Sequence, residues 1–120
     1  MATPDQIRAT LDAYRATFSA NDREAWLDLF TDDATVEDPI GSELQRGREA
    51  IGAFFDTSHS MADNIELRPA GPVPVAGHEA AMPFTIVVEV GGSKMAIDPC
   101  RLLSVVRSSV TVWFLASFSV

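Results

Sequence analysis

The hydrophobic spacing of the chain changes near Asn64 from a mainly helical pattern, interrupted by one short strand pattern at residues 34–38, to a strand pattern. Before that point, apolar residues recur at intervals of three and four, which is typical of helices with one buried face. After it, apolar and polar residues alternate, which is typical of strands. Gly91-Gly92 separates two alternating runs and predicts a two-residue hairpin. Helices followed by a meander of strands predict an α+β fold in which a curved sheet wraps the helices.

The first helix has the clearest start signal. Thr3 and Gln6 have the spacing of a capping box, and Pro4 suits the first helical position, so the spacing predicts a helix from Pro4 onward. The stripe that follows, at intervals of four, three and four, consists of Ile7, Leu11, Tyr14 and Phe18. Tyr14 is therefore expected to face inward.

Two further helices are predicted before the strands begin. Asn21-Asp22-Arg23-Glu24 resembles a second capping box and predicts a short helix. Its apolar side carries Trp26, Leu27, Leu29 and Phe30. A third helix is predicted from about Arg48 to Ser58, after a loop from Ile40 to Gly47. Its apolar side carries Ile51, Phe54, Phe55 and Ser58.

Strands are predicted at about 64–75, 79–90 and 93–98 and within the tail from residue 99 to 120. The second of them presents one apolar face, formed by Met82, Phe84, Ile86, Val88 and Val90. Proline cannot donate a ladder hydrogen bond, so we expect Pro99 to end the third strand. The tail contains none of the chain's 17 acidic residues and is rich in Val, Phe and Trp, which favours a strand pair over a membrane span.

The bulk composition restricts the class of protein. A chain of 120 residues forms one domain (residues 1–120), and 47% apolar residues suffice for a core and an apolar cavity. The net charge of -8 argues against nucleic acid as a partner. Cys100 is the one cysteine and cannot form an intramolecular disulfide, which fits a reducing cytoplasm. The first residues lack the pattern of a signal peptide.

Tyr14, Asp38 and Asp98 are the candidate catalytic residues. Alternation in a short strand over residues 34–38 directs Asp38 to the face of its small apolar neighbours, where a carboxylate is costly unless it has a function. Taken singly, each residue has an ordinary explanation. A tyrosine on an inner face is usually part of the core, an aspartate before Pro39 commonly starts a turn, and a strand aspartate can pair with an arginine.

Taken together, the three residues suit one type of reaction. Moving a double bond next to a ketone requires a base to remove an α-proton and donors to hold the enolate oxygen. A carboxylate can act as the base, and a tyrosine hydroxyl and a protonated carboxyl can act as donors. The histidine pattern of a zinc helix, the P-loop and the nucleophile elbow are absent from the sequence, which argues against metal, nucleotide and covalent chemistry.

One long run and several short segments resemble a known family. They are Thr3-Pro4, the Tyr14 helix, residues 29–43, Ala50-Ile51, Glu79-Ala80-Ala81 and Ile97-Asp98. On these residues the chain resembles the bacterial Δ5-3-ketosteroid isomerases (steroid Δ-isomerases) of the NTF2-like, SnoaL-like superfamily. The resemblance covers about residues 3–98. It implies a homodimer of cone-shaped α+β subunits in which helices pack in a curved, mostly antiparallel mixed sheet, with no cofactor.

The resemblance also implies residue roles. Asp38 would be the base that moves a proton from C4 to C6 of the steroid, Tyr14 the principal donor to the C3 oxygen, and Asp98 the protonated second donor. A steroid pocket would be lined by Phe18, Phe54, Phe55, Phe84, Ile86 and Val88. Ordinary core packing explains these six residues nearly as well. The main alternative function is a non-catalytic domain that binds a hydrophobic small molecule. An interaction module and a hydrolase or cyclase are further alternatives.

Two features depart from the family pattern. Phe55 stands where some relatives have a second tyrosine, and Tyr14 is the one tyrosine here, so an extended tyrosine network is not expected. The segment 99–120 is atypical, and we hypothesise a shifted reading frame or another late alteration after Asp98. Such an alteration would affect dimerisation and the position of Asp98. It would also make the strand at 110–115 an aggregation risk if that strand were exposed.

Overall fold

The computed structural model describes residues 3–37, 43–77, 79–106 and 110–116, and for residues 79, 98–106 and 110–116 it describes the backbone alone. In chain order the elements are α1 (Pro4–Ser19), α2 (Arg23–Leu27), β1 (Thr35–Glu37), β2 (Gln45–Arg46), α3 (Gly47–Ser60), β3 (Asn64–Pro69), β4 (Val75–Ala76), β5 (Glu79–Val90), β6 (Ser93–Val106) and β7 (Val110–Ala116). The short strand β2 lies in what the sequence predicts as a loop, because its two residues pair with Thr35 and Val36.

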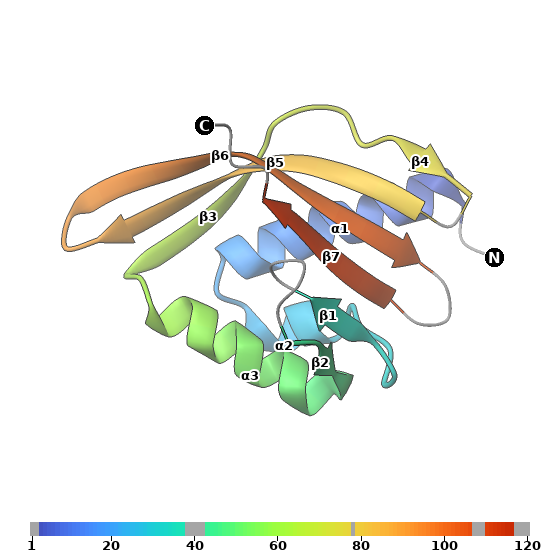
Figure 1. Ribbon diagram of the computed structural model, residues 1–120, viewed down its shortest axis with the longest axis horizontal. Coiled ribbons are helices and arrows are strands. Elements are labelled where there is room, and N and C mark those ends of the chain that lie inside the picture. Colours follow the sequence, from blue (N-terminus) through green and yellow to red (C-terminus); the bar gives the residue numbers. More distant parts are fainter. Residues whose placement is uncertain (1–2, 38–42, 78, 107–109, 117–120) are drawn as a thin grey trace.

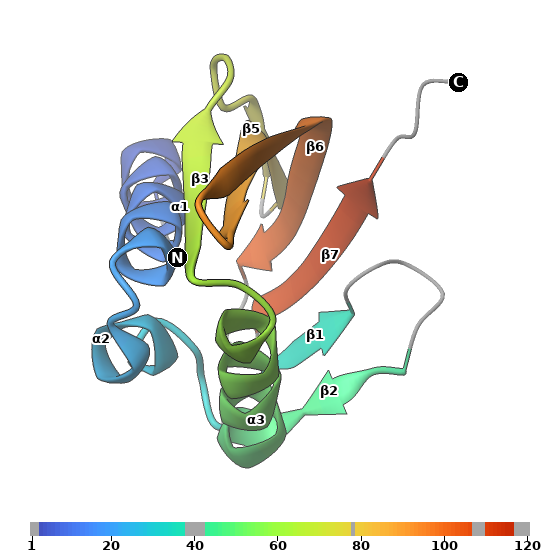
Figure 2. The same ribbon diagram turned by 90° about the vertical axis from the view of Figure 1, so that its left-hand side faces the viewer.

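The strands form one curved sheet that arches over the helices (Figure 1). The order along the described sheet is β2-β1-β7-β6-β5-β3, and β4 pairs with β5. Neighbouring strands are antiparallel except β1 and β7, which are parallel. Helix α1 runs along β3, whereas α3 lies near β1 and β2 (Figure 2). The predicted α+β fold with a mostly antiparallel mixed sheet is confirmed.

Helix α1 begins as the sequence predicts. The Thr3 hydroxyl accepts a hydrogen bond from the Gln6 amide, and the Thr3 amide donates to the Gln6 side chain, so the capping box is complete. The predicted inward stripe is buried and consists of Ile7, Leu11, Tyr14 and Phe18. These residues form the core together with Trp26 and Phe30 from the α2 region and Ile51 and Phe55 from α3.

The start of α2 differs by one residue from the predicted capping box. Asp22, not Asn21, caps the helix, and its carboxylate accepts a hydrogen bond from the Ala25 amide at 3.3 Å. Asn21 adopts a left-handed conformation with φ of 57°, which asparagine tolerates better than most residues. That conformation turns the chain after α1, so the cap moves to the next residue.

The prediction that Pro99 ends its strand is wrong. Strand β6 continues through Pro99 to Val106. The pairing with β5 shifts here, because Phe84 pairs with Cys100 while Ile86 pairs with Ile97. Two residues of β6 therefore lie opposite one residue of β5, as in a β-bulge, and a bulge is where a sheet tolerates a residue without an amide proton.

The tail forms the strand pair that the sequence favours. Strand β6 pairs with β7 over seven residue pairs, from Cys100–Ala116 to Val106–Val110. Strand β7 also pairs with β1 and is therefore an internal strand, so the expected aggregation risk of an exposed strand at 110–115 does not apply. No helix among the described residues is long and apolar enough to cross a membrane. Resequencing the coding DNA remains the test of the reading-frame hypothesis.

Candidate active site

A cavity of about 400 Å³ opens between α1, the end of α3 and the strands β3, β5 and β6. Its volume lies within the ~300–1,000 Å³ that is typical of small-molecule sites. The described residues that line it are Tyr14, Phe18, Ser58, Met61, Ala62, Ile65, Leu67, Ile86, Val88, Val90, Met95 and Ile97. Ten of these twelve have apolar side chains, so the cavity suits an apolar ligand.

The sheet wall of the cavity consists of two apolar rows that cross three strands. One row is Leu67, Ile86 and Ile97, and the other is Ile65, Val88 and Met95. Four of these six residues, all but Ile86 and Val88, were not predicted from the sequence. Folding the chain about Gly91-Gly92 would have found Met95 and Ile97, because that hairpin sets them opposite Val88 and Ile86.

Tyr14 lies at the inner end of the cavity. Its side chain is 4% exposed, and its ring packs against Phe18, Trp26 and Phe30 at centroid distances of 6.2, 5.5 and 6.1 Å. Aromatic contacts on several sides restrict the ring to one orientation. A fixed hydroxyl loses little entropy on binding, which suits a hydrogen-bond donor for a developing oxyanion.

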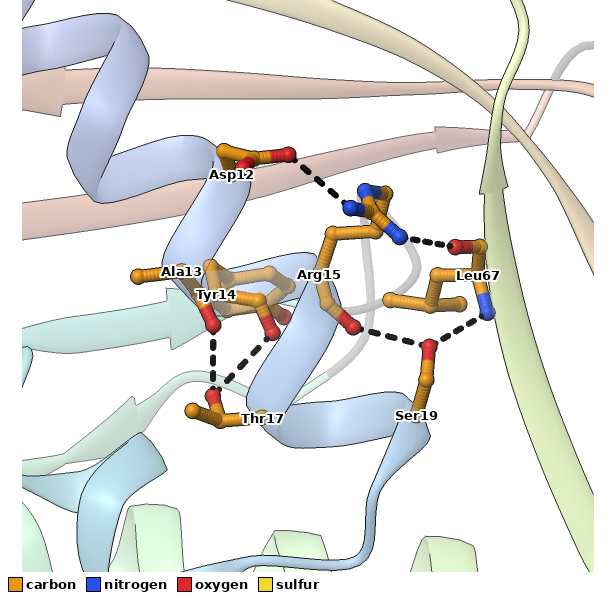
Figure 3. A network of polar contacts seen from close by, with 7 residues as sticks. All are labelled: Asp12, Ala13, Tyr14, Arg15, Thr17, Ser19 and Leu67. Atoms are coloured by element: carbon orange, nitrogen blue, oxygen red, sulfur yellow. Dashed lines mark hydrogen bonds and ion pairs between the residues drawn. The ribbon is translucent and has the colours of Figure 1, made fainter.

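Polar contacts fix the Tyr14 helix against strand β3 (Figure 3). The Ser19 hydroxyl accepts a hydrogen bond from the Leu67 amide at 2.9 Å and donates to the Arg15 carbonyl at 2.8 Å. The Arg15 guanidinium donates to the Leu67 carbonyl at 3.3 Å and pairs with Asp12 at 2.9 Å. Since Leu67 lines the cavity, these bonds set the distance between the Tyr14 helix and the sheet wall.

His59 connects α3 to the end of α1. Its Nε2 lies 2.8 Å from the Phe18 carbonyl oxygen and its Nδ1 lies 2.9 Å from the Phe55 carbonyl oxygen. The ring also stacks on Phe55 and packs against Phe18, with centroids 4.0 and 4.5 Å away. These contacts give His59 a structural role. Because Phe18 lines the cavity, His59 supports its wall.

The segment that leads to Asp38 is fixed at its start. The Gly47 amide donates to the Ala34 carbonyl at 2.9 Å, and Arg48 donates to the Phe30 carbonyl through Nε at 3.1 Å and Nη2 at 2.6 Å. These bonds attach the beginning of α3 to Phe30 and Ala34, the residues just before and after the segment 31–33. Strand β1 then ends at Glu37, and Asp38 itself lies outside the described residues.

The other predicted site residues differ in position. The backbone of Asp98 follows Ile97 in β6, so it lies next to a residue that lines the cavity, and its side chain lies outside the description. Phe18, Ile86 and Val88 line the cavity. Phe55 and Phe84 are 1% and 0% exposed in the core, and Phe54 packs against that core. These three fit the core explanation that the sequence left open.

The mouth of the cavity exposes apolar side chains. Met61 and Met95 are 74% and 61% exposed, and Val90 is 55% exposed. Met61 follows the last residue of α3, whereas Val90 and Met95 lie on either side of the β5–β6 turn. Apolar groups of this size are costly in water, so a ligand that reaches the mouth would gain by covering them.

Charge lies outside the described cavity. Glu66 alternates with Ile65 and Leu67 on β3, and the hydrogen bond from Arg68 lowers the pKa of its carboxyl below the ordinary 4.5. A lowered pKa means that the ionised form favours the folded state, and this contribution is lost as the pH falls through the folded-state value.

The described residues contain no group of three His, Cys, Asp or Glu side chains that could hold a metal ion.

Comparison with known proteins identifies the class. A family model described as the SnoaL-like domain matches residues 11–111, so the chain belongs to this family. The match extends through β6 into β7, beyond residue 98, where the resemblance seen in the sequence ends. The chain is also 29% identical over 99 residues to a steroid Delta-isomerase from Nocardioides simplex, which covers 82% of this chain and 78% of that protein.

Solved structures share the fold. One is a hypothetical protein with a ketosteroid isomerase-like fold from Catenulispora acidiphila, in complex with trimethylamine, with a TM-score of 0.80, 20% identity, and coverage of 98% of this chain and 89% of that one. Another is the epoxide hydrolase/cyclase-like enzyme SalBIII, described in pyran ring formation in salinomycin, with a TM-score of 0.83, 18% identity, and coverage of 98% and 95%. The predicted NTF2-like fold is therefore confirmed.

Proposed function

We propose that this protein is a steroid Δ-isomerase that converts a 3-oxo-Δ5-steroid to its conjugated Δ4 isomer. The observation that carries the proposal is the apolar cavity with the buried Tyr14 at its inner end. The similarity to a steroid Delta-isomerase and the sequence run around Asp38 support the same activity.

The proposed reaction is an intramolecular proton transfer. The Asp38 carboxylate removes a proton from C4, the C4–H bond breaks, and its electrons form a dienolate with negative charge on the C3 oxygen. Tyr14 donates a hydrogen bond to that oxygen, and a protonated Asp98 would be the second donor. Asp38 then returns the proton to C6, so the double bond moves from C5–C6 to C4–C5 and the carboxylate is regenerated.

The apolar lining contributes to this chemistry in two ways. It accommodates four fused hydrocarbon rings without leaving buried polar groups of the protein unsatisfied. It also lowers the local dielectric, which strengthens the hydrogen bond from Tyr14 to an oxyanion more than the bond to the neutral ketone. The gain is therefore larger in the transition state than in the ground state, as catalysis requires.

The isomerisation can be followed by the ultraviolet absorbance of the conjugated enone. The wild-type protein should convert the substrate, and Asp38→Asn should lose about 10²–10⁴-fold of the rate while still binding steroid, because general-base catalysis contributes that much. Full activity in Asp38→Asn would exclude the proposed base. Steroid binding without turnover in the wild type would favour a non-catalytic binding protein, and absence of steroid binding would favour a hydrolase or cyclase of the same fold.

We also propose that the protein is a homodimer, on the resemblance to ketosteroid isomerases. Light scattering should then give a mass of twice the 13.0 kDa of one chain. A mass of 13.0 kDa at micromolar concentration would contradict the dimer and leave the proposed activity to its own test.

A further inference from the structure

Among the described residues that line the cavity, two carry a hydroxyl group: Tyr14 on α1 and Ser58 on α3. The other ten present carbon or sulfur atoms. In a site with so few polar groups, each one strongly affects which ligands bind, because a mismatched polar group loses its water and gains nothing in return.

The two hydroxyl-bearing residues lie at different depths. Tyr14 is 4% exposed and packs against Trp26 and Phe30, which lie behind the cavity in the core. Ser58 is partly exposed and lies three residues before Met61, which is 74% exposed at the mouth. Residues three apart lie on the same side of a helix, so Ser58 lies about one helical turn from Met61.

The Ser58 hydroxyl can accept a further hydrogen bond, but it cannot donate one without breaking the bond that it already makes. Its proton is donated to the Phe54 carbonyl oxygen at 2.9 Å, which leaves the lone pairs of its oxygen for a ligand. A ligand hydroxyl can donate to those lone pairs. A ligand ketone has no proton to donate, and it could pair with Ser58 only if the bond to Phe54 were broken.

We propose that Ser58 selects steroids with a hydroxyl group, over steroids with a ketone, at the end remote from the oxygen that Tyr14 holds. The inference rests on the proposed function, because it requires the steroid to lie with its 3-oxo group at Tyr14. Ser58 is then a specificity-determining residue that has no part in the proton transfer.

A matched pair of ligands tests the preference in binding alone. Testosterone and androstenedione share the conjugated enone and differ in a hydroxyl or a ketone on the ring farthest from it. Their dissociation constants can be measured by calorimetry, without turnover. One hydrogen bond of ordinary net strength predicts that the wild type binds testosterone about five- to tenfold more tightly than androstenedione.

Variants of α3 separate the Ser58 contact from general effects. Ser58→Ala should bind the two steroids with equal affinity, and its affinity for androstenedione should match that of the wild type. Ser58→Thr keeps an acceptor hydroxyl and should keep the preference. Ser60→Ala is the matched control, because Ser60 is an exposed serine of the same helix that bonds the Thr57 carbonyl and does not line the cavity. It should keep the preference as well.

The outcomes distinguish the two levels of the proposal. Equal binding of both steroids by the wild type, or a preference that persists in Ser58→Ala, would overturn the role of Ser58 and leave the isomerase proposal intact. If neither steroid bound to the wild type, the proposed function would be overturned and the inference with it.

Discussion

The proposed chemistry depends on the hydroxyl group of Tyr14. Tyr14→Phe should lower kcat by about 10²–10³-fold, the usual cost of one oxyanion donor, because the hydrogen bond to the dienolate is lost. The phenyl ring should keep the packing against Trp26 and Phe30, so the fold should persist. Steady-state kinetics and circular dichroism measure the two effects.

Thr10→Ala provides the control for Tyr14→Phe. Thr10 lies on the same helix, where its hydroxyl donates to the Gln6 carbonyl at 3.0 Å, and it does not line the cavity. Its removal should leave kcat within about twofold of wild type, since surface substitutions away from a site cost little. Equal losses in the two variants would mean that Tyr14 acts through helix stability instead.

His59 is expected to contribute to stability. His59→Ala removes the contacts to the Phe18 and Phe55 carbonyls and the ring packing between two helices, so it should lower the free energy of unfolding by about 2–3 kcal/mol. Thr57→Ala, an exposed change in the same helix, should cost less than about 0.5 kcal/mol. Denaturant unfolding monitored by circular dichroism measures both values, and equal stability of the two variants would show that the His59 contacts contribute nothing.

For single residues, the spacing of apolar positions predicted which side chains of a helix would be buried. The stripe that includes Tyr14 follows from helical periodicity alone, and its burial confirms the prediction. The hydrogen bond from Ser58 to Phe54 is equally local, but its importance depends on a cavity formed by other elements. The sequence could not separate core residues from cavity-lining residues at Phe54, Phe55 and Phe84. An apolar residue on an inner face suits either position.

At the scale of elements, the β5–β6 hairpin depends on its two glycines. Gly91 and Gly92 have φ angles of 58° and 82°, the positive values that a tight hairpin of this kind requires at both positions. Gly92→Ala should therefore cost about 1 kcal/mol of stability, although the added methyl group has no neighbour within 4 Å.

The comparison variants for this turn are Gly92→Asn and Ser93→Ala. Asparagine tolerates the left-handed region and should cost less than alanine at position 92. Ser93→Ala changes an exposed residue with ordinary backbone angles and should be nearly neutral. Thermal unfolding ranks the three, and a neutral Gly92→Ala would mean that the turn does not constrain this conformation.

Element types were largely predictable because each has a local signal. Pairing was predictable where a hairpin joins consecutive strands, as at Gly91-Gly92, but not between strands distant in sequence. The rule that proline ends a strand failed at Pro99. At the bulge that contains Pro99, β6 has two residues where its partner β5 has one. That compensation involves Phe84 and Ile86, residues distant in sequence, so no local pattern contains it. The parallel pairing of β1 with β7 likewise joins residues more than seventy positions apart, such as Thr35 and Thr111.

At the scale of the whole molecule, β7 joins two parts of the sheet. It pairs with β1 on one side and with β6 on the other, so β1 and β2 reach the rest of the sheet through it. Deleting residues 110–120 should expose both neighbouring edges and abolish cooperative unfolding. A cooperative transition at the wild-type temperature after this deletion would contradict this role of β7.

The transfer of an isotope label tests whether Asp38 carries one proton from C4 to C6, because the apolar cavity would shield that proton from exchange with water. The substrate carries deuterium at both hydrogen positions of C4, and nuclear magnetic resonance of the product locates the label after conversion by the wild-type protein. We predict product with deuterium at C6, because Asp38 returns what it removed before water replaces it. Product without deuterium at C6, or no product at all, would contradict the proposed isomerase mechanism.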